Sequence, residues 1–219
     1  MITRCARPRI RGRSKLVSGP CNPAVTSQGE GETMTMPVMS DHLYTFDEWR
    51  ELPEDERLKI EVVEGVRTVS PRGYAFHQRA LHRLLARLEE DLPRRWSPLA
   101  EVDVVLSKKP LTVRIPDIVV ADSAVVDANP PRLFGADVRL AVEVLSEGTR
   151  RVDRVMKFAE YAEAGIAQYW IIDLDPPISL RAFTLVDGMY ELDGEFSGIQ
   201  VLHVAGHPVR LDLTALTAR

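Results

Sequence analysis

The sequence predicts a mixed α/β (α+β) domain, in which a central mixed β-sheet is flanked by a few α-helices. The chain has 219 residues, of which 45% are hydrophobic and 27% are charged, a balance that can bury a core. Short apolar runs of strand length alternate with longer segments of helical periodicity. No uncharged apolar run approaches the ~20 residues of a membrane-spanning helix, so we expect no membrane partner.

Charge and cysteine content exclude further classes. The formal net charge is -4, which argues against a basic coat for nucleic acid. The two cysteines, Cys5 and Cys21, both lie near the N-terminus. Neither a disulfide framework nor a cysteine metal site can therefore hold the core together.

The N-terminal segment, residues 1–36, differs from the rest of the chain. Six basic residues against two acidic ones give residues 1–33 a net charge of +4, so residues 34–219 carry -8. The segment is rich in Gly, Pro, Ser and Thr, which is typical of a disordered tail. We favour a mis-assigned start, with translation from Met34, Met36 or Met39, over a transit peptide or a basic arm that contacts phosphates. The apolar region of a secretory signal is missing, so we expect a cytoplasmic protein whose residues 37–219 form a single domain.

The first elements of this domain are two helices and a hairpin. Thr45 is a suitable N-cap for the first helix, and Glu64-Gly65 suits a hairpin turn. Leucines at helical spacing mark the longer helix, which Pro93 ends. The predicted elements are a helix over Asp47–Leu58, strands over Lys59–Val63 and Val66–Val69, and a helix over Tyr74–Leu92.

The rest of the domain is mostly strands. Asn129-Pro130-Pro131 requires a loop, and Gly165 suits a helix end. The predicted elements are strands over Ala100–Leu106, Leu111–Val113 and Asp117–Ala121, a loop over Val125–Phe134, a strand over Arg139–Leu145, a helix over Arg151–Glu163, and strands over Gln168–Asp173, Ser179–Phe183, Met189–Leu192, Gln200–Val204 and Val209–Leu213.

Two carboxylates occupy unusual places in this pattern. Glu143 lies inside an apolar run that is typical of a strand buried on both faces, where an ionised side chain is costly unless it is paired or binds a metal. Asp117 follows Pro116 and opens an apolar strand, and strand ends are where active sites gather in open sheets. Taken singly, Glu143 could equally be salt-bridged to an arginine, and Asp117 could simply start a strand.

One face of the predicted helix after Glu143 carries further polar groups. Asp153, Lys157 and Tyr161 are spaced four residues apart and therefore share that face. A surface ion pair worth ~0.3–0.5 kcal/mol would explain Asp153 and Lys157. The functional alternative is that Lys157 points back to the Glu143 strand. Two carboxylates on neighbouring strand ends could then hold a hard cation, and a lysine beside it would complete a site for phosphodiester hydrolysis.

The motifs at these residues resemble a known nuclease pattern. Arg114-Ile115-Pro116-Asp117, followed by Val142-Glu143-Val144-Leu145-Ser146, is similar to the PD-(D/E)xK signature. The block from Glu143 through Thr149, Asp153, Lys157, Tyr161, Gly165-Ile166 and Tyr169-Trp170 to Asp173 resembles the Uma-two family of restriction endonucleases. Upstream, Glu61-Val62-Val63-Glu64-Gly65, Ser70-Pro71 and His77 resemble the beginning of that family's domain. The resemblance covers roughly residues 42–212.

This resemblance implies a restriction-endonuclease-like fold and assigns roles to residues. Asp117 and Glu143 would bind Mg²⁺ or Mn²⁺, the carbonyl of Val144 would be a third ligand, and Lys157 would be the catalytic lysine. Glu61 would face the site from the N-terminal helical side. The superfamily's lysine normally lies two residues after the glutamate, where this chain has Leu145, so Lys157 must replace it from the next helix.

The sequence contains further basic residues that could contact nucleic acid. Arg150, Arg151 and Arg154 lie beside the expected site and are the best candidates for phosphate contacts. Arg79, Arg83 and Arg87 repeat every four residues, but we interpret them as a solvated helix face. His77 and His82 are five residues apart, which does not suit a metal pair on a helix, and we interpret both as structural.

The sequence therefore predicts a metal-dependent endonuclease that cleaves phosphodiester bonds, with DNA as the expected substrate and a homodimer as the expected assembly. Two alternatives remain open. One is a non-catalytic nucleic-acid-binding or assembly module that keeps the fold. The other is a hydrolase of another phosphate ester.

Overall fold

The computed structural model describes residues 42–52, 59–70, 73–145 and 155–218. The predictions for residues 1–36 and for Asp153, Arg150, Arg151 and Arg154 lie outside these ranges. The described part from residue 42 onward belongs to one compact unit of mixed α and β structure. The predicted fold class is confirmed.

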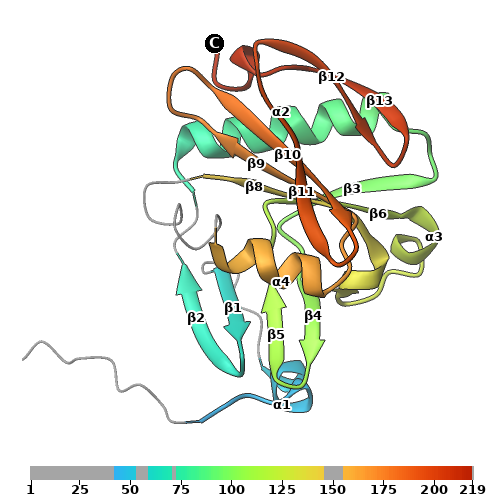
Figure 1. The fold of residues 1–219 in the computed structure, drawn as a ribbon. Helices are drawn as coiled ribbons and strands as arrows, with labels where there is room; N and C mark the ends of the chain where they lie inside the picture. Colours follow the sequence, from blue (N-terminus) through green and yellow to red (C-terminus); the bar gives the residue numbers. More distant parts are fainter. Residues whose placement is uncertain (1–41, 53–58, 71–72, 146–154, 219) are drawn as a thin grey trace, which may run out of the picture. The chain divides into compact units, whose positions relative to one another are not determined.

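A six-stranded mixed sheet forms the centre of the domain (Figure 1), with strand order β11-β10-β9-β8-β6-β3. Its β8–β9 pair is parallel, and the other pairs are antiparallel. The strands are β3 (Trp96–Ala100), β6 (Ile118–Asp122), β8 (Val138–Val144), β9 (Gln168–Asp173), β10 (Ser179–Val186) and β11 (Met189–Ser197).

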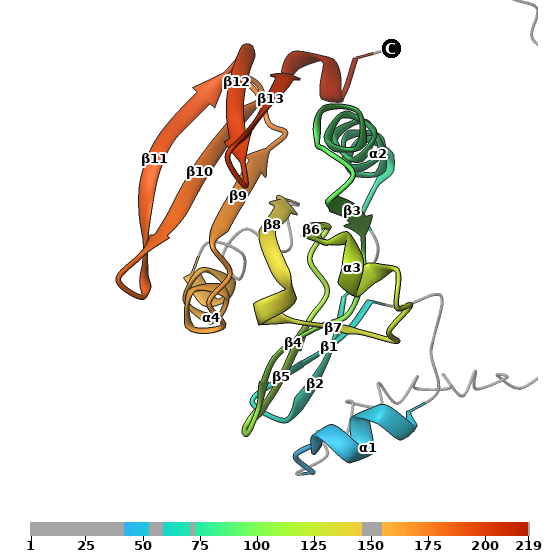
Figure 2. The same ribbon diagram turned by 90° about the vertical axis from the view of Figure 1, so that its right-hand side faces the viewer.

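Helices cover the two faces of this sheet. On one face, α2 (Ala75–Asp91) packs its leucines against the sheet, together with the hairpin of β12 (Ile199–Val204) and β13 (His207–Asp212) and the short helix η3 (Thr214–Leu216). The opposite face packs against α4 (Lys157–Glu163) and α3 (Ser123–Val126). Figure 2 shows α2 and α4 on opposite sides of β8 and β6. The predicted apolar stripe of the long helix therefore faces the core, as its periodicity requires.

A second sheet of five strands has the order β2-β1-β5-β4-β7. Its strands are β1 (Lys59–Val63), β2 (Val66–Ser70), β4 (Val104–Lys108), β5 (Leu111–Arg114) and β7 (Leu133–Phe134), the last of these followed by η1 (Gly135–Asp137). Helix α1 (Phe46–Glu51) buries Trp49 against this sheet. The predicted cap, Thr45, forms a reciprocal capping box with Glu48.

Two sequence predictions are wrong in this region. A single strand over Ala100–Leu106 is replaced by the end of β3 and the start of β4, because Glu101 adopts a left-handed conformation with φ 51° and breaks the run. Pro98 is accommodated in β3 because β3 is an edge strand. The segment expected to be a loop over Val125–Phe134 contains the end of α3 and all of β7. The first helix ends at Glu51 within the described residues.

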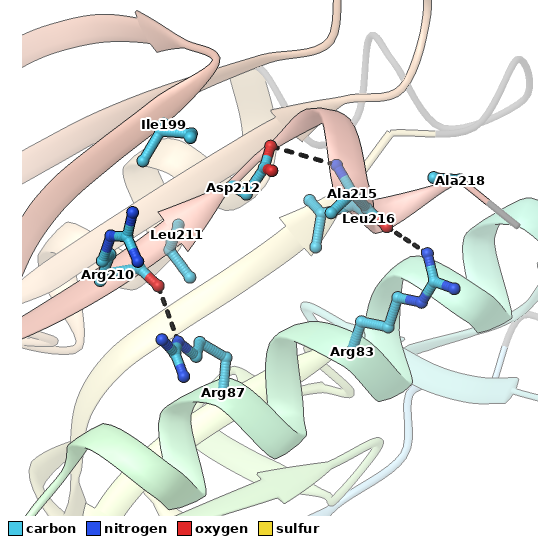
Figure 3. Close-up of a pocket in the computed structure, with 9 residues that line it drawn as sticks. All are labelled: Arg83, Arg87, Ile199, Arg210, Leu211, Asp212, Ala215, Leu216 and Ala218. Atoms are coloured by element: carbon cyan, nitrogen blue, oxygen red, sulfur yellow. Dashed lines mark hydrogen bonds between the residues drawn. The ribbon is translucent and has the colours of Figure 1, made fainter.

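The three arginines of α2 have a structural partner that periodicity did not suggest. Arg79 donates to the carbonyls of Thr217 and Ala218, Arg83 to that of Ala215, and Arg87 to that of Arg210. Arg83 and Arg87 also line a pocket of about 440 Å³ between α2 and the C-terminal segment (Figure 3). The stripe is therefore not simply a solvated face, because it hydrogen-bonds the end of the chain to α2.

Candidate active site

Asp117 and Glu143 meet across two neighbouring strands. The antiparallel register of β6 and β8 pairs Ile118 with Val142, and continuing it by one residue places Asp117 opposite Glu143. Residues opposite each other on one face of an antiparallel pair have Cβ atoms about 4.5–5.5 Å apart. Both side chains are almost fully buried, with exposed fractions of 3% for Asp117 and 2% for Glu143. Asp117 is two residues from Val119, and Glu143 is two residues from Ala141; both apolar residues pack in the cluster on the α4 side, so the two carboxylates point to that face.

Asp117 receives hydrogen bonds from three elements. Its Oδ1 accepts from Lys59 Nζ at 2.9 Å, while its Oδ2 accepts from the Val144 N–H at 2.7 Å and lies 3.1 Å from His77 Nε2. Burial opposes ionisation, but the Lys59 charge and the His77 hydrogen bond outweigh it and hold the pKa of Asp117 well below its usual range. Asp117 is therefore a carboxylate at neutral pH.

Lys59 and His77 keep their protons more strongly as a result. Burial alone would lower the pKa of the Lys59 ammonium, but the charges of Asp117 and Glu143 raise it above its ordinary value. Burial likewise acts against a charged His77, and its hydrogen bond to Asp117 raises the pKa of the imidazole. His77 is thus part of the site, where the helical spacing had suggested only a structural role.

Glu143 is held by two side chains of α4. Its Oε1 accepts from Lys157 Nζ at 2.9 Å and from the Tyr161 hydroxyl at 2.6 Å. Because Lys157 and Tyr161 are four residues apart, one helix face presents both, as their spacing predicts. Burial, followed by the Glu143 charge, raises the pKa of Tyr161 well above its ordinary value, so its hydroxyl remains a donor.

A chain of ion pairs, formed by Glu61, Arg114 and Glu160, begins beside Lys157. Glu61 Oε1 lies 3.6 Å from Lys157 Nζ and accepts from the Ile115 N–H at 3.0 Å. Glu61 Oε2 accepts from Arg114 at 3.0 Å, and the same guanidinium binds both oxygens of Glu160 at 2.6 and 2.8 Å. Burial disfavours ionised Glu61, but Lys157 and Arg114 together lower its pKa. Glu61 reaches the site from strand β1, not from an N-terminal helix as expected.

The arrangement suits oxygen coordination of a divalent cation by few protein ligands. Within the described ranges, no group of three or more His, Cys, Asp or Glu side chains could hold a metal by itself. Asp117 and Glu143 supply two carboxylates. The Val144 N–H points to Asp117, and the N–H and C=O of one residue in an extended strand point to the same side, so the Val144 carbonyl faces this edge too. Two carboxylates, a carbonyl and water match the donors that Mg²⁺ accepts.

Three residues of the site were missed from the sequence: Lys59, Arg114 and Glu160. A signal existed for Lys59, because it is two residues from Glu61 in a predicted strand and therefore shares its face. Arg114 is the one charged residue in the otherwise uncharged run from Leu111 to Ile115, and it is only 2% exposed. No comparable pattern marks Glu160.

Comparison with known proteins identifies the family and the fold of the chain. The model of the Uma2 family, described as "Putative restriction endonuclease", matches residues 46–215. The chain belongs to the Uma2 family. Among solved structures, the Uma2 chain is similar to one from Anabaena variabilis ATCC 29413 described as "a putative nuclease belonging to DUF820", with a TM-score of 0.63 and 19% identity over 80% of this chain and 97% of that chain. None of the curated proteins matches.

The fold of this Uma2 chain is therefore restriction-endonuclease-like. In the part of the chain that the structure describes, no helix is long and apolar enough to cross a membrane.

Proposed function

We propose that this Uma2 protein is a metal-dependent endonuclease that hydrolyses phosphodiester bonds in DNA. The contact that best supports this function is the 2.9 Å pair between Lys157 and Glu143, on a strand whose next residue, Val144, binds Asp117. Lys157 on α4 would thus take the role of the superfamily's lysine, whose usual position on the strand is Leu145 in this chain. Leu145 itself is 4% exposed and packs in the core on the α4 face.

Asp117, Glu143 and the Val144 carbonyl would hold Mg²⁺ or Mn²⁺. When bound, such an ion polarises the phosphoryl oxygen and makes water a better nucleophile at neutral pH. Asp117 is suited to this role because its lowered pKa keeps it ionised. Tyr161 orients Glu143 through their 2.6 Å hydrogen bond.

The chain's own groups would then assist an in-line displacement. A water oxygen forms the new bond to phosphorus as one P–O ester bond breaks. The water gives up a proton to solvent, and the leaving oxygen takes one up, so the products are a phosphate monoester end and a hydroxyl end. Lys157 would position the water or stabilise the charge that builds on the phosphoryl oxygens. Glu61, held by Arg114, would keep the Lys157 ammonium in place.

Cutting both strands of a duplex at once requires two such sites, and a symmetric homodimer would provide them. Residues 34–219 carry a net charge of -8, so DNA contacts must be local and should weaken steeply with salt. Arg150, Arg151 and Arg154 stay candidates for these contacts. A cytoplasmic location fits a nuclease of this kind.

A second candidate function is a non-catalytic nucleic-acid-binding module. The observation that favours it is that protein cations already neutralise both carboxylates: Lys59 pairs with Asp117, and Lys157 pairs with Glu143. Such a network can stabilise a domain without a metal.

Nicking and digestion assays separate the two functions. Supercoiled plasmid, fragmented genomic duplex, single-stranded DNA and RNA are incubated with Mg²⁺, Mn²⁺ or chelator. We expect wild-type protein to cleave DNA only with metal, and Asp117→Asn and Lys157→Met to lose cleavage. Asp187→Asn and Lys109→Met are matched controls on the exposed surface and should cleave as wild type does.

Genomic duplex contains every short recognition sequence, so an intact genomic substrate cannot be explained by a missing recognition sequence. If folded wild-type protein leaves all four substrates intact with both metals, the endonuclease proposal is wrong. Salt-dependent binding of the same nucleic acids would then support the non-catalytic module.

A further inference from the structure

We propose that Lys59 is a second catalytic lysine, which contacts the phosphate group under attack. This inference rests on the proposed nuclease function and assigns to the site a group that neither the sequence pattern nor the family resemblance supplied. Lys59 is the first residue of β1, whereas Lys157 belongs to α4. Two ammonium groups therefore reach the carboxylate pair from different elements.

The two oxygens of Asp117 have different surroundings. Oδ2 is taken up by the protein framework, through the Val144 N–H at 2.7 Å and His77 at 3.1 Å. Oδ1 has Lys59 Nζ at 2.9 Å. Oδ1 is therefore the oxygen that Asp117 would offer to a cation without losing these framework contacts, and the Lys59 ammonium lies beside it.

Lys59 is the more accessible of the two lysines. Its side chain is 13% exposed and that of Lys157 is 5% exposed. Lys157 is also fixed more firmly, because Glu61 lies 3.6 Å from its ammonium and Tyr161 shares its acceptor on Glu143. The more exposed ammonium is better placed to meet a large anionic substrate, and the more enclosed one to order a small molecule such as water.

A divalent cation bound to Asp117 would displace the Lys59 ammonium toward a phosphate by charge repulsion. A divalent cation on Asp117 would carry twice the charge of the ammonium it replaces, so Lys59 would be repelled from Oδ1. Its flexible stem allows the ammonium to shift without a change in strand β1. A phosphate oxygen entering beside the cation would be the nearest new anion, and ammonium–phosphate hydrogen bonds are strong because both groups are charged.

A simpler role for Lys59 would be to balance the charge of Asp117 in the metal-free protein. The two roles differ when metal saturates the site. If Lys59 only balances charge, the metal takes over that task and Lys59 becomes dispensable. If Lys59 contacts the phosphate, it remains necessary with metal bound.

The test compares full-length wild-type protein with Lys59→Met, Lys59→Gln and the surface control Lys109→Met. The Gln variant keeps a hydrogen-bond donor for Asp117, so one variant remains interpretable if the Met variant fails to fold. Manganese affinity is measured by titration calorimetry without substrate, and DNA cleavage is measured at saturating Mn²⁺.

We expect both Lys59 variants to bind Mn²⁺ at least as tightly as wild type, because a competing ammonium is gone, and to cleave at least 100-fold more slowly. Loss of one group that stabilises transition-state charge costs about 10²–10³ in rate. Cleavage within threefold of wild type at saturating Mn²⁺ would overturn the proposal for Lys59. Cleavage by wild type itself reports separately on the nuclease function, because its absence would overturn both proposals.

Discussion

Replacing Arg114 by Met should destabilise the domain strongly. Arg114 is 2% exposed and forms three hydrogen bonds to two carboxylates, one to Glu61 and two to Glu160. Removing one partner of a buried ion pair costs about 3–5 kcal/mol, because the other charge is left uncompensated in the interior. Lys157, at 3.6 Å from Glu61, compensates part of that charge. We therefore expect a loss close to the lower bound, about 3 kcal/mol.

Urea unfolding followed by circular dichroism, at neutral pH with chelator, measures this loss. For a domain of this size about 3 kcal/mol corresponds to a fall in Tm of roughly 6–12 °C. Arg50→Met is the matched control: its side chain is 55% exposed and lies 3.8 Å from Glu51, so it should cost less than about 1 kcal/mol. Arg114→Lys retains the charge without the planar fork and should fall between the two. A loss below about 1 kcal/mol for Arg114→Met would refute the assignment of Arg114 as the ion-pair centre that holds Glu61.

Three further predictions concern individual contacts. Tyr161→Phe removes a buried hydrogen bond to a charged group and should cost about 1.5–3 kcal/mol in urea unfolding, with slower cleavage because Glu143 loses its orienting donor. The pKa of Glu61 is lowered from 4.5, so its contribution to stability is present above pH 4.5 and is lost as the pH falls through the folded-state pKa; Glu61→Gln should flatten this acid dependence in the metal-free protein. Arg83→Met should lower the free energy of unfolding by about 1 kcal/mol, because the hydrogen bond to the Ala215 carbonyl is lost. We expect its cleavage activity to equal that of wild type, because this hydrogen bond lies outside the proposed active site.

The placement of the two carboxylates could be predicted from local pattern. A glutamate inside a run of strand-forming residues must be paired or functional, because burial of an isolated charge is costly. The structure places Glu143 in that environment, with Lys157 and Tyr161 as its partners. Helical spacing predicted that Lys157 and Tyr161 share a face, and the structure packs that face of α4 against β8, where Glu143 lies. The catalytic and metal-binding roles of these residues remain predictions.

Contacts between distant segments could not be predicted in the same way. Lys59 and Asp117 are 58 residues apart, and Arg114 and Glu160 are 46 residues apart. Such pairs depend on how the sheet of β1 packs beside the central sheet, which no local period encodes. The same limit applies to the arginines of α2. Their spacing defined a stripe, but the C-terminal carbonyls that accept from it lie more than a hundred residues away.

The sequence by itself determined the class of fold, the apolar faces of the main elements and the residues whose charge is costly to bury. These properties follow from periodicity and from the free energy of moving charge out of water, which are local to a segment. Only the tertiary structure decided which charges meet. The register of β6 and β8 set Asp117 opposite Glu143, and the packing of β1 and α4 brought a lysine to each carboxylate. Partner choice is a tertiary property because a buried ion pair requires two distant segments to reach the same few ångströms.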